Sequence, residues 1–109
     1  MQTDAREISM DDLRDALSRG EPVTVLDIRH APDSAEWSIP GSLHLDVYDA
    51  VGMNDAGALG AFTPPSSAPV VTVCYRGNTS LLAMAQLRQR GIEAVSLHGG
   101  MRAWTLAWN

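Results

Sequence analysis

The single cysteine of this chain, Cys74, lies where an apolar stretch ends and a short polar segment begins. Residues 70–73 are typical of a strand, residues 75–79 are typical of a loop, and a helix-like run follows. At such a junction the first N–H groups of the helix lack partners, and the helix dipole adds partial positive charge. Gly77 permits the left-handed backbone that a cradle of N–H groups requires, and Arg76 adds a full positive charge.

This setting favours the thiolate of Cys74, which is the nucleophilic form of cysteine, over the thiol. A cysteine that ends an apolar strand can also be a packing residue, because free cysteine is among the most buried residue types. The order of strand, cysteine, five small or polar residues and helix favours a reactive thiol. We therefore predict that Cys74 is a nucleophile held by the N–H groups of its loop.

The rest of the chain alternates between strand-like and helix-like segments. Expected strands cover residues 23–29, 43–45, 70–73 and 94–97, and expected helices follow Ser9, start at Ser80 and begin near Gly99. Alternation of this kind predicts an α/β domain with a mostly parallel sheet and helices on both faces. Ligands bind beyond the carboxyl ends of such strands, which is where Cys74 is expected, at the end of a central strand.

Residues 46–69 are rich in glycine and proline and show no clear period. Long loops without structure are uncommon in compact domains, so short helical pieces are expected here, with residues 58–62 forming a helical turn or two.

The composition excludes several classes of protein. A length of 109 residues suits one domain over residues 1–109, and one cysteine cannot form an internal disulfide. The net charge is −5 and the eight basic residues, all arginines, are scattered, so no nucleic-acid partner is expected. No apolar run approaches the ~20 residues that span a bilayer, so no membrane partner is expected. The first residues do not resemble a secretory signal, and a cytoplasmic location is expected.

Other residues that could carry chemistry are interpreted as structural. Asp27 and Arg29, at the end of a strand, are interpreted as a scaffold that holds loops near the site. His30, His44 and His98 do not have the spacing of metal ligands and are expected in loops or at the surface.

Four segments of the chain resemble the single-domain rhodaneses. "CYRGNTS", residues 74–80, resembles the active-site loop of that family, and "VLDIR", residues 25–29, is similar to its strand ending in Asp-x-Arg. "IPGSLHL", residues 39–45, matches the segment that leads into the next strand, and "LHGGMRAW", residues 97–104, resembles the Gly-Gly-x-x-x-Trp ending. One departure is that Trp37 and Ser38 stand where the family often has Gly-His. The resemblance implies a single rhodanese-like domain with a mostly parallel sheet of about five strands.

The resemblance further implies a thiosulfate sulfurtransferase. The thiolate of Cys74 would attack the outer sulfur of thiosulfate or a related sulfane donor, release sulfite and leave a persulfide, from which cyanide or a thiol would remove the sulfur. Carried over by position, Cys74 is catalytic. The substrate-binding residues are Tyr75, Arg76, Gly77, Asn78 and Thr79. The implied partners are a small anionic sulfur donor and a thiol or protein acceptor, and no cofactor or metal is expected.

Two other functions compete with this interpretation. Phosphatases and arsenate reductases of the Cys-x5-Arg type use a similar cysteine loop, but Ser80 stands where their signature has arginine. A module that docks a partner without catalysis, or carries sulfur to it, is the second alternative.

Overall fold

The sheet is built from short strands whose central members are buried on both faces. The computed structural model describes residues 5–108, and in that part of the chain the strand order is β1-β5-β4-β2-β3 with every neighbouring pair parallel. In β2 (Thr24–Asp27), β4 (Val70–Val73) and β5 (Ala94–Leu97) every residue is buried, as expected for strands covered by helices on both sides. The edge strands β1 (Glu7–Ile8) and β3 (Leu43–His44) have two residues each.

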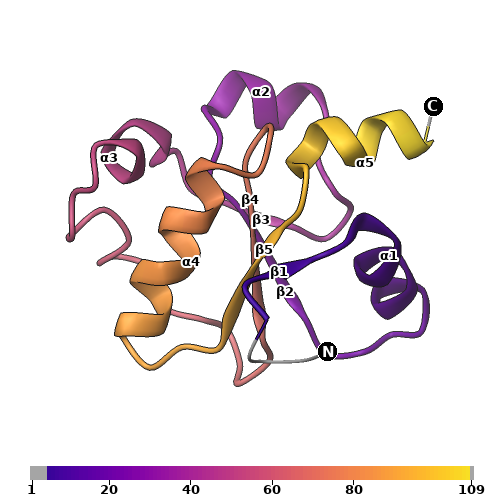
Figure 1. The fold of residues 1–109 in the computed structure, drawn as a ribbon, viewed down its shortest axis with the longest axis horizontal. Coiled ribbons are helices and arrows are strands. Elements are labelled where there is room, and N and C mark those ends of the chain that lie inside the picture. Colours follow the sequence, from indigo (N-terminus) through magenta and orange to yellow (C-terminus); the bar gives the residue numbers. More distant parts are fainter. Residues whose placement is uncertain (1–4, 109) are drawn as a thin grey trace.

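Helices cover both faces of this sheet, as Figure 1 shows. The helices are α1 (Met10–Ser18), α2 (Ala31–Glu36), α3 (Tyr48–Gly52), α4 (Thr79–Gln89) and α5 (Gly100–Trp108). α1 and α5 lie on one face and contact each other, whereas α3 and α4 lie together on the other face. None of the helices in residues 5–108 is both long enough and apolar enough to cross a bilayer.

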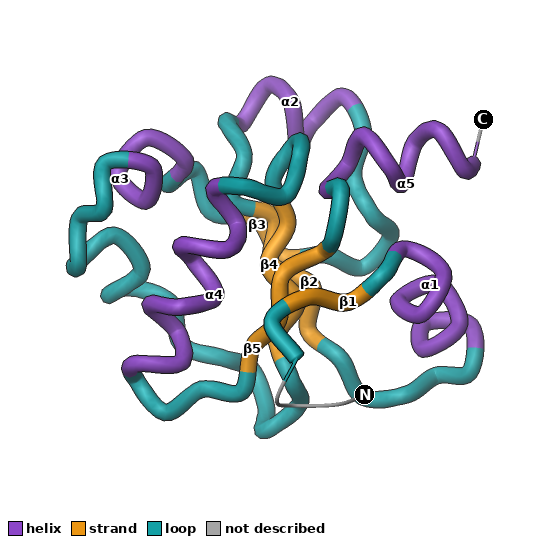
Figure 2. Tube along the Cα trace, in the orientation of Figure 1, coloured by secondary structure: helices purple, strands orange, loops and turns teal. Residues whose placement is uncertain are grey.

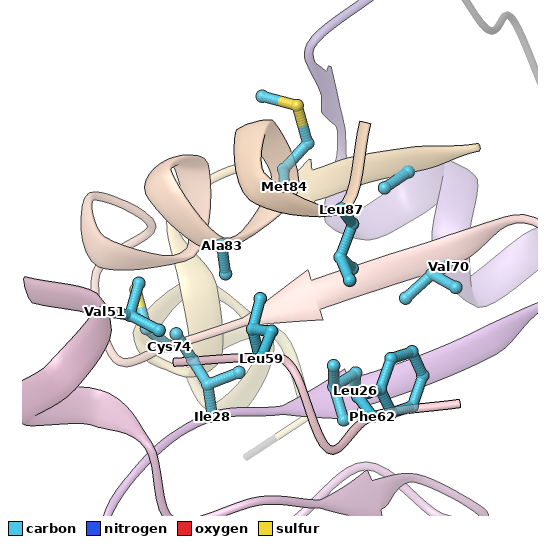
Figure 3. Packing of buried hydrophobic residues seen from close by; sticks show 11 residues of the cluster. Leu26, Ile28, Val51, Leu59, Phe62, Val70, Cys74, Ala83, Met84 and Leu87 are labelled. Atoms are coloured by element: carbon cyan, nitrogen blue, oxygen red, sulfur yellow. The ribbon is translucent and has the colours of Figure 1, made fainter. Parts of the chain in front are cut away.

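Each face of the sheet has its own hydrophobic core. The core under α4 contains Leu26, Leu59, Leu87 and also Cys74, as Figure 3 shows. The core under α1 and α5 contains Trp104 and the side chains of β4 and β5 that point the other way. Cys74 therefore follows directly after β4, inside a packed layer, and is only 2% exposed.

The architecture confirms the predicted α/β fold with helices on both faces and places Cys74 after a central strand. The helix predicted to follow Ser9 is α1, and Ser9 caps it, since its Oγ accepts from Asp12 N–H at 3.1 Å. The strand predicted over residues 23–29 is shorter, with β2 ending at Asp27. Two elements, β1 and α2, were not predicted. Both are short and lack the period that identifies longer elements.

The expectation for residues 46–69 was only partly correct. One short helix, α3, is present, but residues 58–62 are not helical. Residues 55–62 instead form successive turns, in which Ala58, Gly60 and Phe62 each donate a backbone hydrogen bond to the carbonyl three residues earlier. Leu59 and Phe62 are buried in the core under α4, so tertiary packing holds this segment.

A buried ion pair fixes the end of β2, which confirms the interpretation of Asp27 and Arg29 as scaffold. Arg29 Nη2 lies 2.7 Å from Asp27 Oδ2, and Arg29 Nε lies 3.0 Å from Asp27 Oδ1. Both side chains are almost fully buried. Arg29 also donates to the carbonyl of Trp37, and its own carbonyl is 2.7 Å from His44 Nε2. The pair thereby joins β2 to the segment after α2 and to β3.

We predict that Arg29→Met lowers the free energy of unfolding by about 3–5 kcal/mol, because Asp27 is left as a buried charge without its partner. Urea denaturation measures this loss. The double variant Asp27→Ala/Arg29→Met should recover part of it, since the orphaned charge is removed as well.

The control is Arg19→Met, which breaks the exposed pair of Arg19 and Glu21, with atoms 3.7 Å apart. This change should alter stability by less than about 1 kcal/mol. Equal losses for the two single variants would show that the buried pair has no special role.

Candidate active site

Two backbone N–H groups point at the sulfur of Cys74. Gly77 N–H donates to Cys74 Sγ at 3.1 Å, and Ser80 N–H donates at 3.3 Å. Ser80 belongs to the first turn of α4, so the positive end of the helix dipole also faces the sulfur. The arrangement binds a negatively charged sulfur atom better than a neutral one.

The sulfur takes the place of a helix cap. Asn78 occupies the cap position of α4, but its side chain makes no capping hydrogen bond. Its backbone is already helical, with φ −85° and ψ −54°, whereas a capping side chain goes with an extended backbone. Ser80 N–H, which a cap would normally satisfy, is satisfied by Cys74 Sγ.

Gly77 makes the turn of the loop possible. Its φ is +95°, and a Cβ at this position would lie 3.0 Å from Gly99 N and 3.1 Å from Leu97 O. A side chain is therefore disfavoured both by the backbone angle and by the close approach of the segment after β5.

The start of α5 holds the loop from the other side. Met101 N–H donates to Cys74 O and Arg102 N–H donates to Tyr75 O, both at 2.9 Å. These N–H groups belong to the first turn of α5, where no carbonyl of the helix can accept from them. Figure 2 shows that the loops after β4 and β5 leave the sheet at the same end, the carboxyl end of these parallel strands, where this contact forms.

The other residues of the predicted binding loop lie farther from the sulfur. The side chains of Tyr75, Arg76 and Asn78 are exposed, and that of Thr79 is half-buried. The Arg76 guanidinium lies 5.9 Å from the centre of the Tyr75 ring. The loop backbone surrounds the sulfur, whereas these side chains are available to a molecule that approaches from solvent.

Tyr75 and Met101 also line a pocket of about 500 Å³ beside the loop. Asp33 and Glu36 of α2 contribute negative charge to this pocket. His30 lines it too, and its hydrogen bond to the carboxylate of Asp49 raises the pKa of His30.

The three histidines occupy the surface and loop positions expected from the sequence. His30 is hydrogen-bonded to Asp49, and His98 is hydrogen-bonded to Glu7, each over 3.0 Å. His44 lies on the edge strand β3 and is exposed. They come from separate parts of the fold and face different partners.

Sequence reasoning missed two polar residues of the site, one in contact with the sulfur and one in contact with the first. Ser80 was considered only as the start of a helix and as the replacement for an arginine, yet both its N–H and its hydroxyl contact Cys74 Sγ. Ser96, in the middle of β5, lies with its Oγ 2.7 Å from Ser80 Oγ. A serine within the otherwise apolar stretch "AVSL" was the available signal, since a buried hydroxyl needs a partner.

Comparison with known proteins links this fold and loop to one family. The model of the rhodanese-like domain family matches residues 9–107. The thiosulfate sulfurtransferase GlpE of Pseudomonas paraeruginosa is 40% identical over 81 residues, which are 73% of this chain and 67% of that protein. GlpE of Pseudomonas fluorescens is 36% identical over 87 residues, which are 79% of this chain and 73% of that protein.

Two solved structures extend the likeness to the whole fold. The human single-domain sulfurtransferase TSTD1 is 26% identical with a TM-score of 0.72, and the match covers 94% of this chain and 96% of that one. A rhodanese-like domain protein from Staphylococcus aureus is 29% identical with a TM-score of 0.72, over 92% of this chain and 91% of that one.

The contact between α5 and the loop gives a testable prediction at Gly100. Its φ is +58°, and a Cβ there would collide with Cys74 O and lie 2.5 Å from Tyr75 O. We predict that Gly100→Ala lowers the free energy of unfolding by more than about 2 kcal/mol, because a backbone clash adds to the cost of the left-handed angle. Thermal unfolding measures the change.

The matched control is Gly91→Ala. Gly91 has a similar φ of +79°, but a Cβ there has open space. This variant should lose only the roughly 1–2 kcal/mol of the backbone angle. If Gly100→Ala is no less stable than Gly91→Ala, the close packing of α5 on the loop is not a constraint.

Proposed function

This chain belongs to the rhodanese-like domain family, and on that premise we propose that it is a thiosulfate sulfurtransferase whose Cys74 carries the transferred sulfur. The proposal is supported above all by the two N–H groups, of Gly77 and Ser80, that donate to Cys74 Sγ. The relatives named thiosulfate sulfurtransferase GlpE and the human sulfurtransferase TSTD1 support the same activity.

The first half of the reaction loads sulfur onto the enzyme. The thiolate of Cys74 attacks the outer sulfur of thiosulfate, a new S–S bond forms, and the bond to the sulfonate sulfur breaks. Sulfite leaves with the electron pair, and the persulfide keeps one negative charge, so charge and atoms balance. Donors that surround the sulfur lower the energy of the charged forms on both sides of this step.

The second half returns the enzyme to its starting state. A thiophilic acceptor, such as cyanide or a thiolate, attacks the outer sulfur of the persulfide, and the thiolate of Cys74 is the leaving group. The product is thiocyanate or a new persulfide. The two half-reactions share one covalent intermediate, so the kinetics are of the ping-pong type.

Arg76 is proposed as the contact for the sulfonate group of thiosulfate. The donor is a dianion, while the protein has a net charge of −5 and the pocket beside the loop carries Asp33 and Glu36. The exposed guanidinium of Arg76 is the charge within the loop that can offset this repulsion. Tyr75, Asn78 and Thr79 complete the proposed binding loop around Cys74.

The competing phosphatase and arsenate reductase function has less support. Its Cys-x5-Arg signature needs an arginine at position 80 to bind the oxygens of the anion, and this position holds Ser80, fully buried below the sulfur. A single domain over residues 1–109, a thiol or protein acceptor in the cell and a cytoplasmic location remain predictions.

We predict that Cys74→Ser abolishes sulfur transfer and leaves the fold intact. A serine fits the same space and can accept the hydrogen bonds of Gly77 and Ser80, but it cannot hold a persulfide. A thiocyanate assay with thiosulfate and cyanide, together with circular dichroism, checks both parts. Mass spectrometry after incubation with thiosulfate should show one added sulfur atom on the parent chain and none on the variant. Turnover within a few-fold of the parent would exclude Cys74 as the sulfur carrier.

We predict that Arg76→Ala raises KM for thiosulfate and lowers kcat/KM roughly ten- to hundred-fold, because an ionic contact to the sulfonate is lost. The loss should be smaller at high salt and smaller for an uncharged sulfur donor. Arg19→Ala, which removes another exposed arginine far along the chain, is the control for net charge. If both donors respond equally, or neither responds, Arg76 does not bind the sulfonate.

A further inference from the structure

A chain of buried hydroxyl groups reaches the sulfur from inside the protein. Ser80 Oγ lies 3.3 Å from Cys74 Sγ and 2.7 Å from Ser96 Oγ. Ser80 and Ser96 are both fully buried, and they come from α4 and from β5. The sulfur thus has a hydroxyl partner on its buried side in addition to the two N–H groups of Gly77 and Ser80.

The direction of these hydrogen bonds depends on the state of the sulfur. A hydroxyl donates one hydrogen bond and accepts up to two. When Cys74 is a thiol, its S–H donates to Ser80 Oγ, and Ser80 can donate to Ser96. When Cys74 is a thiolate, no proton lies between Sγ and Oγ unless the Ser80 hydroxyl turns its own proton toward the sulfur.

Ser96 can hold the Ser80 hydroxyl in this second orientation. Either of the two serine oxygens can be the donor across the 2.7 Å contact. If Ser96 donates, a lone pair of Ser80 Oγ is occupied and the Ser80 proton is free to point at Sγ. Both serines are fully buried, so the protein groups around them set this orientation.

We propose that Ser96 is a positioning residue that orients the Ser80 hydroxyl as a third hydrogen-bond donor to the sulfur of Cys74. When the thiol becomes a thiolate, its proton passes to solvent, both hydroxyl protons rotate, and no proton leaves either serine. The role of this pair in sulfur transfer rests on the proposed function. Its effect on the charge state of Cys74 does not, because that effect follows from the contacts alone.

A purely structural role is the competing explanation, since the contact between Ser80 and Ser96 also ties α4 to the sheet. Thr72 provides a matched comparison. Its Oγ1 donates to the carbonyl of Ser80 at 2.7 Å, it is fully buried, and it ties α4 to β4. Thr72→Val removes a hydrogen bond to the same residue and leaves the hydroxyl pair in place.

The experiment compares Ser80→Ala, Ser96→Ala, the double variant and Thr72→Val, each checked for folding by thermal unfolding. The ultraviolet absorbance of the thiolate is followed as the pH is lowered, with the iodoacetamide-alkylated protein as the blank. Because the chain has one cysteine, the signal belongs to Cys74. Steady-state kinetics with thiosulfate and cyanide give kcat/KM for the same proteins.

We expect Ser80→Ala to lose the thiolate signal at a higher pH than the parent and to lower kcat/KM about ten-fold, since a donor to a charged sulfur is removed. Ser96→Ala should move the loss of the thiolate signal in the same direction by a smaller amount, and it should lower kcat/KM about three-fold. The double variant should match Ser80→Ala, because Ser96 acts only through the Ser80 hydroxyl. Thr72→Val should lower the unfolding temperature and leave the thiolate signal as in the parent.

The proposal is overturned if Ser96→Ala behaves like Thr72→Val, or if the effects of Ser80→Ala and Ser96→Ala add in the double variant. Should Ser80→Ala fail to fold, the comparison of Ser96→Ala with Thr72→Val still decides the role of Ser96. Failure of the proposed function has a different signature, since sulfur transfer would then survive Cys74→Ser while the thiolate titration still decides the role of Ser96.

Discussion

The start of α4 creates the constraint on which the site depends. The first N–H groups of any helix need acceptors, and at this helix the acceptor of Ser80 N–H is the sulfur of Cys74. β4 ends four residues before the loop turns at Gly77, so the strand delivers the sulfur to the place where the helix begins. The contact that satisfies the helix N–H also places partial positive charge beside the sulfur, so it serves both the stability of the helix and the proposed reactivity of the thiol.

Backbone groups of α5, on the face of the sheet opposite α4, reinforce this arrangement. The first N–H groups of α5 donate to the carbonyls of Cys74 and Tyr75, which points the loop's acceptors away from the sulfur and its donors toward it. Gly100 permits this approach because it has no side chain to collide with those carbonyls. Two helix N-termini, from opposite faces of the sheet, therefore meet at one loop, and neither needs a charged side chain to hold it.

Local patterns were sufficient to predict much of the backbone geometry of this candidate site. Cys74 after an apolar strand, Gly77 at a left-handed position and a helix directly afterwards are signals that lie within ten residues of one another. Ser96 could not be placed at the sulfur in the same way, because its contact with Ser80 joins residues that are distant in sequence and adjacent only in the folded sheet. β1 and α2 were missed for a related reason. A strand of two residues is defined by its pairing with β5, and not by its own sequence.

The use of a sulfur atom as a helix cap has an evolutionary consequence. A descendant of this chain that lost the thiol would lose the proposed nucleophile and would also leave Ser80 N–H buried without an acceptor. Serine, threonine or aspartate at position 74 would supply an oxygen in its place, as these residues do at the start of other helices. Alanine or valine would not. Loss of the thiol is therefore tolerated most easily when one of these polar residues replaces Cys74. The loop can then keep its conformation in a chain that no longer transfers sulfur.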